Sequence, residues 1–511
     1  MTDRLTYENI SPQVRKLAMV GLALGMLVAC MDGTIVGTCA NVISKDLGGE
    51  ELYSWMITTY LLCESAMVPI AGKMSDRYGR KPLFLIGLIL FVAGSIFAGL
   101  SNSMLMFIIC RGVQGLGGGI LMPVAMASVA DFYSPEDRGK VQGALGAVFG
   151  VGSGIGPLVG GALCEYINWH WVFFINIPII LVCILFTVKK FPERKADTSK
   201  KIDYAGITVL TLIILDVLLY FQWISGEMEF ISARSIGMII IGIILSILFV
   251  SIERRVEDPV LAPKLIHSPT FVKASTYMFI MGLAMIGTLT FIAMYMQQMF
   301  DIGTMECGFY LLPMVVGMMI TSMGSGMLVN KTGYRGWIVA GSTLIMAALL
   351  LMYTMGSDPN KMLLFVYLFI FGLGLGCVNS TVMISVQNHT SIENMGMTTS
   401  AVSLMRNVGS TVGTACYSLI IASQMNSKFA DSIYSFVNDI FNFNGTGLIA
   451  LRYVPGFDIP GQATLAETIV EIFGTSVCAA FLFGGLIYIV ALVISFTMDK
   501  KYTVSEDENR H

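Results

Sequence analysis

The chain has 511 residues, of which 55% are hydrophobic and only 13% carry a charged side chain, and its net charge is −3. Soluble domains contain about 25% charged residues, so this composition excludes an ordinary soluble domain, and the slightly negative charge leaves no basic surface for nucleic acid. Apolar runs long enough to cross a bilayer recur along the chain, which predicts an all-α polytopic membrane protein.

Charged or Gly/Pro-rich breaks divide these runs into fourteen predicted membrane helices. Most of the 31 Lys and Arg residues lie in segments that an even helix count, with both termini inside, would place in the cytoplasm. We therefore predict a multi-pass protein of the cell membrane with both termini cytoplasmic. The predicted spans are 17–42, 53–72, 82–100, 104–130, 139–163, 171–188, 204–223, 235–252, 272–297, 305–328, 337–355, 362–386, 397–423 and 473–497.

The first predicted span carries Asp32 near its middle. We do not expect this span to be a cleavable signal peptide, because it contains an acid and no small-residue cleavage site follows it. A charge at the centre of a bilayer costs roughly 2.5–3.5 kcal/mol, so its presence needs a reason. A buried carboxylate can take up and release protons near neutral pH. We favour a role for Asp32 in coupling to protons or to a cationic substrate. The alternative is that Asp32 is inert and is hydrogen-bonded by Thr34 or by the backbone.

The second span contains Glu64, which either faces a central cavity as a second acid or lies at its wall beside water. The run that follows, GKMSDRYGRK, holds four basic residues against one acid, which predicts a cytoplasmic loop. Asp131 at the end of the fourth span is expected to pair with Arg80 or Arg77, while Asp76 faces the N-terminus of a neighbouring helix. We expect these contacts to hold a gate on the cytoplasmic side closed. The residues of this inner gate are Gly72, Asp76, Arg77, Gly79, Arg80, Lys81 and Asp131.

The fourth span contains Arg111, whose guanidinium stays charged and must be neutralised. Asp32 is the natural partner, and such a pair can switch as a proton or a substrate arrives. A purely structural salt bridge is the alternative.

The fifth span, 139–163, repeats glycine at four-residue steps, which permits close helix packing. Gly156-Pro157 predicts a kink or hinge, supported by Gly152 and Gly160. A dinucleotide-binding fingerprint does not fit, because proline stands where the third glycine should be and the segment is a membrane span. We predict no nucleotide site.

The second half of the chain weakly repeats the first, because the run from Gly326 to Arg335 resembles the run at Gly72. The repeat predicts two six-helix bundles, residues 17–188 and 272–497, with two inserted helices and their linkers in 189–271. Asp216, in the first inserted helix, is assigned to packing. The long outer segment 424–471 is expected to lie over the outer mouth.

The second bundle is predicted to contain a buried cation of its own, Arg406. Many of the 35 methionines cluster between Met278 and Met323. They either serve as ordinary core and lipid-facing residues or line a pocket for varied apolar ligands. The ten cysteines include no Cys-x-x-Cys pair, and we expect them to be small apolar packing residues. Neither they nor the four histidines predict a metal site.

These motifs together resemble the major facilitator superfamily, and within it the fourteen-helix drug:proton antiporters. The 72–81 run is similar to a superfamily signature, and the glycine pattern from Gly152 to Gly161 looks like an antiporter motif. Asp32-Gly-Thr34 and Arg406-Asn-Val-Gly409 are similar to the fourteen-helix branch. The resemblance implies that Asp32 and Arg111 take part in proton coupling and that the hinge in the fifth helix biases exchange.

The expected function is proton-driven export of amphipathic, often cationic, drugs or dyes. Export of one natural peptide, lipid or antibiotic is the alternative, and a non-transporting membrane sensor is a weaker one. We expect no enzyme activity and no cofactor, because no nucleophile–base or metal-ligand pattern is present. The expected partners are a small-molecule substrate, protons and the lipid bilayer, and a monomer is the expected state.

Overall fold

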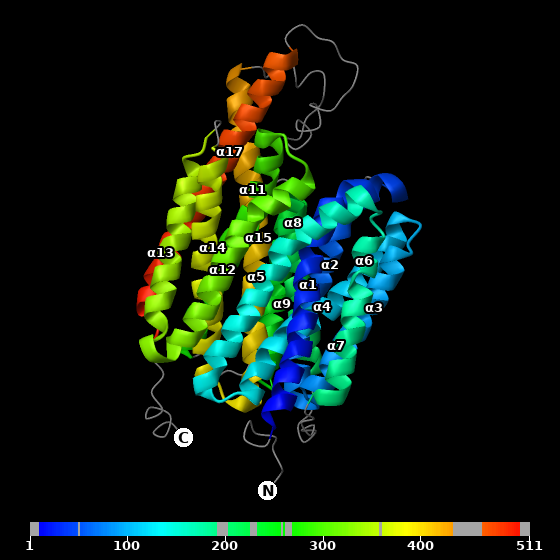
Figure 1. The fold of residues 1–511 in the computed structure, drawn as a ribbon, viewed down its shortest axis with the longest axis vertical. Helices are drawn as coiled ribbons and strands as arrows, with labels where there is room; N and C mark the ends of the chain where they lie inside the picture. Colours follow the sequence, from blue (N-terminus) through cyan, green and yellow to red (C-terminus); the bar gives the residue numbers. More distant parts are fainter. Residues whose placement is uncertain are drawn as a thin grey trace.

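The structure is a computed structural model that describes residues 10–49, 52–191, 203–224, 232–256, 259–260, 268–356, 360–432 and 462–500. Within these ranges the regular structure is entirely helical, and the long helices run side by side (Figure 1). The start of α1 and the end of α17 lie at the same end of the molecule as the run 72–81 (Figure 1). We call this end the 72–81 end.

The first half of the chain forms one group of mutually packed helices. α4 packs against α2 and α3, and α1 packs against α5 and α7. The predicted span 171–188 is divided at Ile175 into two helices, and Pro178 falls in the first turn of the second, where proline is tolerated. The helices are α1 (Pro12–Leu47), α2 (Tyr53–Tyr78), α3 (Arg80–Gly99), α4 (Met104–Phe132), α5 (Pro135–Tyr166), α6 (Trp171–Phe174) and α7 (Asn176–Lys190).

The second half forms a similar group, in which α11 packs against α15 and α17, and α14 packs against α12 and α13. Its helices are α11 (Pro269–Phe300), α12 (Thr304–Thr332), α13 (Tyr334–Tyr353), α14 (Lys361–Asn388), the short η3 (Ile392–Asn394), α15 (Met395–Ser432) and α17 (Gln462–Thr497). The two halves meet mainly where α5 packs against α12 and where α2 packs against α15.

Two further helices, α8 (Tyr204–Ile224) and α9 (Ala233–Glu253), pack against each other, and α8 also contacts α2 and α15. α9 is almost wholly exposed along its isoleucine-rich surface, as expected for a helix that faces lipid. Asp216 of α8 lies against Gly242 of α9, where an added Cβ would be 2.8 Å from the carboxylate.

Twelve helices in the described ranges are long and apolar enough to cross a membrane. The predicted spans 53–72 and 397–423 correspond to α2 and α15, which are helical but fall outside these twelve. Both helices carry more polar residues than the others, and they pack against each other where the two halves meet.

The run 72–81 is not a loop, which corrects the prediction. α2 continues to Tyr78 and α3 begins at Arg80, so Gly79 alone joins them. Gly79 has a φ of 96°, a conformation that favours glycine and reverses the chain without a longer connection. Gly333, with a φ of 86°, joins α12 to α13 in the same way. The weak sequence repeat therefore has a structural counterpart.

At the other end of the molecule, α15 and α17 extend well beyond the predicted limits of 423 and 473 (Figure 1). Residues 433–461, the middle of the predicted outer segment, lie outside the described residues. Within the predicted linker and inserted-helix segment 189–271, residues 192–202, 225–231, 257–258 and 261–267 also lie outside them.

Candidate functional site

The Asp32 carboxylate is completely buried and has three side-chain partners from other helices. Arg111 Nη1 of α4 donates to Asp32 Oδ2 over 2.6 Å. Gln114 Nε2 of α4 and Asn176 Nδ2 of α7 donate to Asp32 Oδ1 over 2.7 and 3.2 Å. An ionised carboxylate at this depth is therefore neutralised by a cation and solvated by two amides.

Arg111 is held on its remaining sides as well. Its Nη1 also donates to Gln114 Oε1 over 2.6 Å, and its Nε donates to the Met56 carbonyl oxygen over 3.4 Å. The guanidinium carbon lies 4.2 Å from the centroid of the Tyr60 ring, within range of a cation–π contact. A buried guanidinium with this many partners has a single preferred position.

Ser95 of α3 completes the cluster, because its Oγ accepts from Gln114 Nε2 over 2.9 Å and from Asn176 Nδ2 over 3.4 Å. We call Asp32, Ser95, Arg111, Gln114 and Asn176 the polar cluster. Sequence reasoning missed three of its members. Two of them could have been found from the sequence. Gln114 follows Arg111 by one helical turn, which places it on the same face of α4, and Asn176 is a polar residue within an otherwise apolar run.

Glu64 of α2 does not join the polar cluster. Its carboxylate forms no hydrogen bond or salt bridge with any described residue. The side chain is only partly buried. Arg406, Asp32 and Arg111 lie within electrostatic range of it.

Arg406 of α15 is buried, with 4% of its surface exposed, and has a very different environment from Arg111. Its Nη2 contacts the Met122 sulfur at 3.2 Å, and its guanidinium lies 4.9 Å from the centroid of the Phe149 ring. Its Nη1 has no hydrogen-bond partner among the described residues. The structure therefore contains a buried cation whose donors are only partly satisfied.

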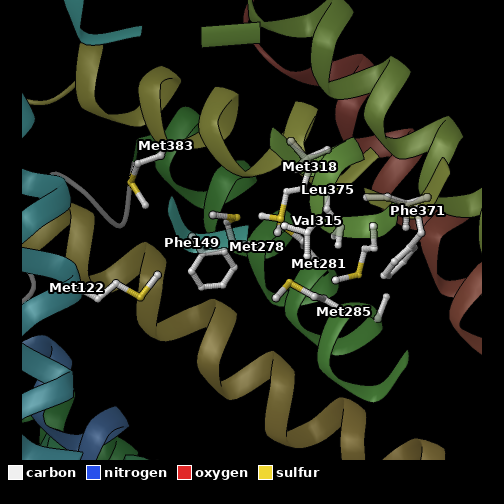
Figure 2. Close-up of a cluster of buried hydrophobic side chains, with 14 of the residues drawn as sticks. Met122, Phe149, Met278, Met281, Met285, Val315, Met318, Phe371, Leu375 and Met383 are labelled. Carbon is white, nitrogen blue, oxygen red and sulfur yellow. The ribbon is translucent and has the colours of Figure 1, made fainter. Parts of the chain in front are cut away.

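Methionine and aromatic side chains surround this region. Figure 2 shows Met122 of α4 and Phe149 of α5 beside buried side chains of the second half. Thioether side chains adapt their shape to varied apolar partners at little cost. The methionines drawn from the second half are Met278, Met281 and Met285 of α11, Met318 of α12 and Met383 of α14.

At the 72–81 end, Asp76 binds the second half of the molecule. Its two carboxylate oxygens accept from the backbone amides of Gly396 and Met397, each over 2.8 Å. These amides begin α15, where the helix dipole favours a negative charge. Arg80 lies 2.7 Å from Asp76 and 2.9 Å from Asp131, so it joins the two acids.

Close backbone approach supports this contact. An added Cβ at Gly72 would lie 2.7 Å from the Gly396 carbonyl oxygen, so only glycine fits between α2 and α15 here. Asp131 pairs with Arg80 and not with Arg77, whose guanidinium lies 5.8 Å from the Tyr78 ring centroid. Lys81 lies in the first turn of α3, next to Arg80.

Arg138, near the start of α5, forms a second contact between the halves that the sequence did not reveal. Its Nη1 donates to the Gln387 carbonyl and to Asn388 Oδ1 over 3.4 and 3.3 Å, at the end of α14. Its Nη2 donates to the Ala130 carbonyl near the end of α4 over 3.2 Å. Cations are favoured at helix C-termini and anions at helix N-termini. Arg138 therefore binds the end of α14, just as Asp76 binds the start of α15.

The glycines of α5 form two packing faces. Gly152, Gly156 and Gly160 face α1, and an added Cβ at Gly156 would lie 2.8 Å from the Met31 carbonyl oxygen. Gly143 faces α12, at 2.5 Å from the Ser322 carbonyl oxygen by the same measure. α5 continues through Pro157 without a break and joins the two halves.

Two cysteines depart from the prediction that all ten are simple packing residues. Cys39 of α1 and Cys164 of α5 form a disulfide at the end of the molecule opposite the 72–81 end. They are 125 residues apart in sequence and meet because the glycine face of α5 packs along α1. The other eight cysteines are free. Within the described ranges, no group of three or more His, Cys, Asp or Glu side chains is placed to hold a metal ion.

The chain has clear similarity to known transporters. The sequence model of the Major Facilitator Superfamily matches residues 22–414. The multidrug transporter protein MdtP of Bacillus subtilis is 31% identical over 492 residues, which cover 93% of this chain and 91% of that protein. Multidrug resistance protein 3 of the same organism is 33% identical over 417 residues, or 82% of this chain and 81% of that protein.

A solved structure shares the fold. The human organic anion transporter MFSD10 (TETRAN) superposes with a TM-score of 0.65 at 14% identity, covering 95% of this chain and all of that chain. The chain thus belongs to the major facilitator superfamily and is a multi-pass membrane transporter rather than an enzyme.

Proposed function

We propose that this transporter is a proton-coupled antiporter that exports amphipathic, often cationic, drugs or dyes by alternating access. The observation that carries the proposal is the fully buried ion pair between Asp32 and Arg111, whose partners among the described residues all belong to the first half. The two multidrug relatives support the substrate class. The proposal includes fourteen membrane spans, with α2 and α15 crossing where the halves meet.

Two independent features support an orientation with the 72–81 end in the cytoplasm. Basic residues concentrate at that end. The Cys39–Cys164 disulfide lies at the opposite end, and disulfides persist in oxidising compartments outside the cytoplasm. Both termini are then cytoplasmic.

In this proposal, the structure represents a state that is closed on the cytoplasmic side. Asp76, Arg80, Asp131 and Arg138 hold the start of α15 and the end of α14 against the first half. A proton on Asp32 would remove its charge and free Arg111 to move. The loss of that fixed ion pair is the local change that favours the other access state, with the glycine faces of α5 allowing the halves to rock.

The energy available is sufficient. At a membrane potential of about 150 mV, each inward charge supplies roughly 3.5 kcal/mol. That energy sustains a substrate gradient of about a few hundredfold. ATP is not required.

The test is dye efflux in everted membrane vesicles under an imposed pH gradient, comparing wild type with Asp32→Asn. We expect gradient-driven transport in wild type and its loss in Asp32→Asn, because asparagine cannot carry the proton. Asp216→Asn is the control, since it neutralises a membrane acid outside the polar cluster and should transport normally. Transport that survives Asp32→Asn would contradict the assignment of Asp32, and absence of dye flux in wild type would favour a dedicated natural substrate.

A further inference from the structure

Glu64 and Arg406 lie at the same depth, one on each half of the transporter. α2 and α15 are antiparallel and meet where Gly72 contacts Gly396 and Ser400, so residues before Gly72 and residues after Ser400 lie on the same side of this contact. Glu64 is eight residues from Gly72, and Arg406 is six residues beyond Ser400 and ten beyond Gly396. At about 1.5 Å of rise per residue, both side chains therefore sit roughly 12 Å from that contact, near the middle of the membrane.

Arg406 needs an acceptor that the described protein does not supply. Among the described residues, four arginines are buried: Arg80, Arg111, Arg138 and Arg406. The first two have carboxylate partners, and Arg138 has backbone carbonyl partners. Only Arg406 has a sulfur atom and an aromatic ring instead, with Nη1 unsatisfied among the described residues. Because a buried guanidinium cannot release its proton, an acceptor from outside the chain would relieve this position.

Glu64 presents the opposite requirement. Its carboxylate is not paired with any described residue, is partly accessible, and interacts electrostatically with Arg406 without contacting it. Asp32 and Arg111 neutralise each other nearby, so they leave this region with one net acid and one net base. Among the described residues, Glu64 and Arg406 thus place one unpaired acid and one poorly satisfied base at the same depth on the two halves.

We propose that the substrate binds between Glu64 and Arg406 and carries both a cationic group and a carboxylate or similar anionic acceptor. The cation binds Glu64, the anionic group accepts from Arg406 Nη1, and the apolar body contacts Met122 and Phe149, which lie against Arg406 (Figure 2). This inference rests on the proposed function and narrows its substrate class. A purely cationic ligand would satisfy Glu64 but be repelled by Arg406, and a purely anionic ligand would meet the reverse problem.

The test uses two dyes that differ in a single charge: rhodamine B, a zwitterion at neutral pH, and its ethyl ester, which keeps the cation but lacks the carboxylate. Binding to the purified protein in lipid nanodiscs is measured by fluorescence anisotropy without any gradient. We expect the wild type to bind rhodamine B about tenfold more tightly than the ester, as one charge-assisted hydrogen bond would give. Arg406→Gln should remove this preference by weakening rhodamine B while leaving the ester unchanged or tighter.

Two further variants separate binding from folding. Glu64→Gln should weaken both dyes, because both carry the cation, whereas Asp216→Asn should change neither. If Arg406→Gln folds poorly, Arg406→Lys provides a second test. It keeps the positive charge and should retain part of the wild-type preference for rhodamine B over its ester. An unchanged preference in Arg406→Gln, an equal loss of both dyes, or no preference in wild type would overturn the proposal. Because no gradient is used, the binding result stands apart from failure of proton-driven transport.

Discussion

Arg111 and Arg406 are the same residue at similar burial, 1% and 4% exposed, one in the interior of each half. Arg111 is bound by a carboxylate, an amide, a carbonyl and a tyrosine ring. Arg406 contacts one methionine sulfur and one phenylalanine ring. Burial alone therefore does not define what a membrane arginine does. In our proposals, the satisfied arginine belongs to an internal switch and the unsatisfied one binds the substrate.

The largest expected contrast is in stability. Arg111→Met should destabilise the protein by about 3–5 kcal/mol, because it leaves the buried Asp32 carboxylate without its cation. Arg406→Met should be neutral or stabilising, because it replaces a poorly satisfied charge with an apolar side chain of similar volume. Unfolding of the purified protein in mixed micelles measures both. Equal destabilisation by the two substitutions would break the comparison.

A second contrast concerns Arg138, a buried arginine satisfied by backbone carbonyls of both halves. Arg138→Gln should open the 72–81 end, because the hydrogen bonds to Gln387 and Asn388 cross between the halves. We expect a maleimide applied from that side to label a Thr399→Cys reporter about tenfold faster, as the loss of a hydrogen bond to a charged group would give.

The matched control for this experiment lies two residues away. Lys140 pairs with Asp137 on the surface of α5 at 3.0 Å, and both side chains are at least half exposed. Lys140→Gln should leave the labelling rate unchanged, since exposed ion pairs contribute little. Faster labelling in both variants would indicate a general charge effect instead of a latch.

The polar cluster also predicts a loss of transport when one of its amides is removed. Asn176 donates to Asp32 Oδ1 and to Ser95 Oγ, so Asn176→Ala leaves each of these buried acceptors with one donor fewer. We expect efflux about tenfold slower than in wild type, as the loss of a hydrogen bond to a charged group would give. Asn168→Ala, in the exposed turn before α6, is the control and should leave efflux unchanged. Unchanged efflux in Asn176→Ala would show that this amide is not needed for the function of the polar cluster.

The smallest functional effect is expected at the disulfide. The unreduced, denatured protein should react with maleimide at eight thiols and, after reduction, at ten. Cys164→Ser should keep efflux within about twofold of wild type, because the glycine face of α5 still packs on α1. Ten reactive thiols before reduction would show that Cys39 and Cys164 are not joined.

Local sequence patterns predicted the helices well, because membrane helices are continuous apolar runs with all backbone hydrogen bonds satisfied internally. The structure has a helix at each predicted span. Their ends were less predictable: Gly79 permits a one-residue connection, so the predicted loop at 72–81 became helix. The sixth span was divided at Ile175, where an asparagine, not an apolar residue, begins the next helix.

The residue pattern alone was enough to identify the class of protein, to locate Asp32, Glu64, Arg111 and Arg406, and to show that they need partners, since a charge in an apolar run is costly wherever the chain folds. Which partners each charge received depended on how the helices pack. Gln114, Ser95 and Asn176 come from three helices, and they surround Asp32 only because α1, α3, α4 and α7 pack together. The same packing left Arg406 beside sulfur and an aromatic ring. Partner choice depends on contacts between residues far apart in sequence, which no local pattern encodes.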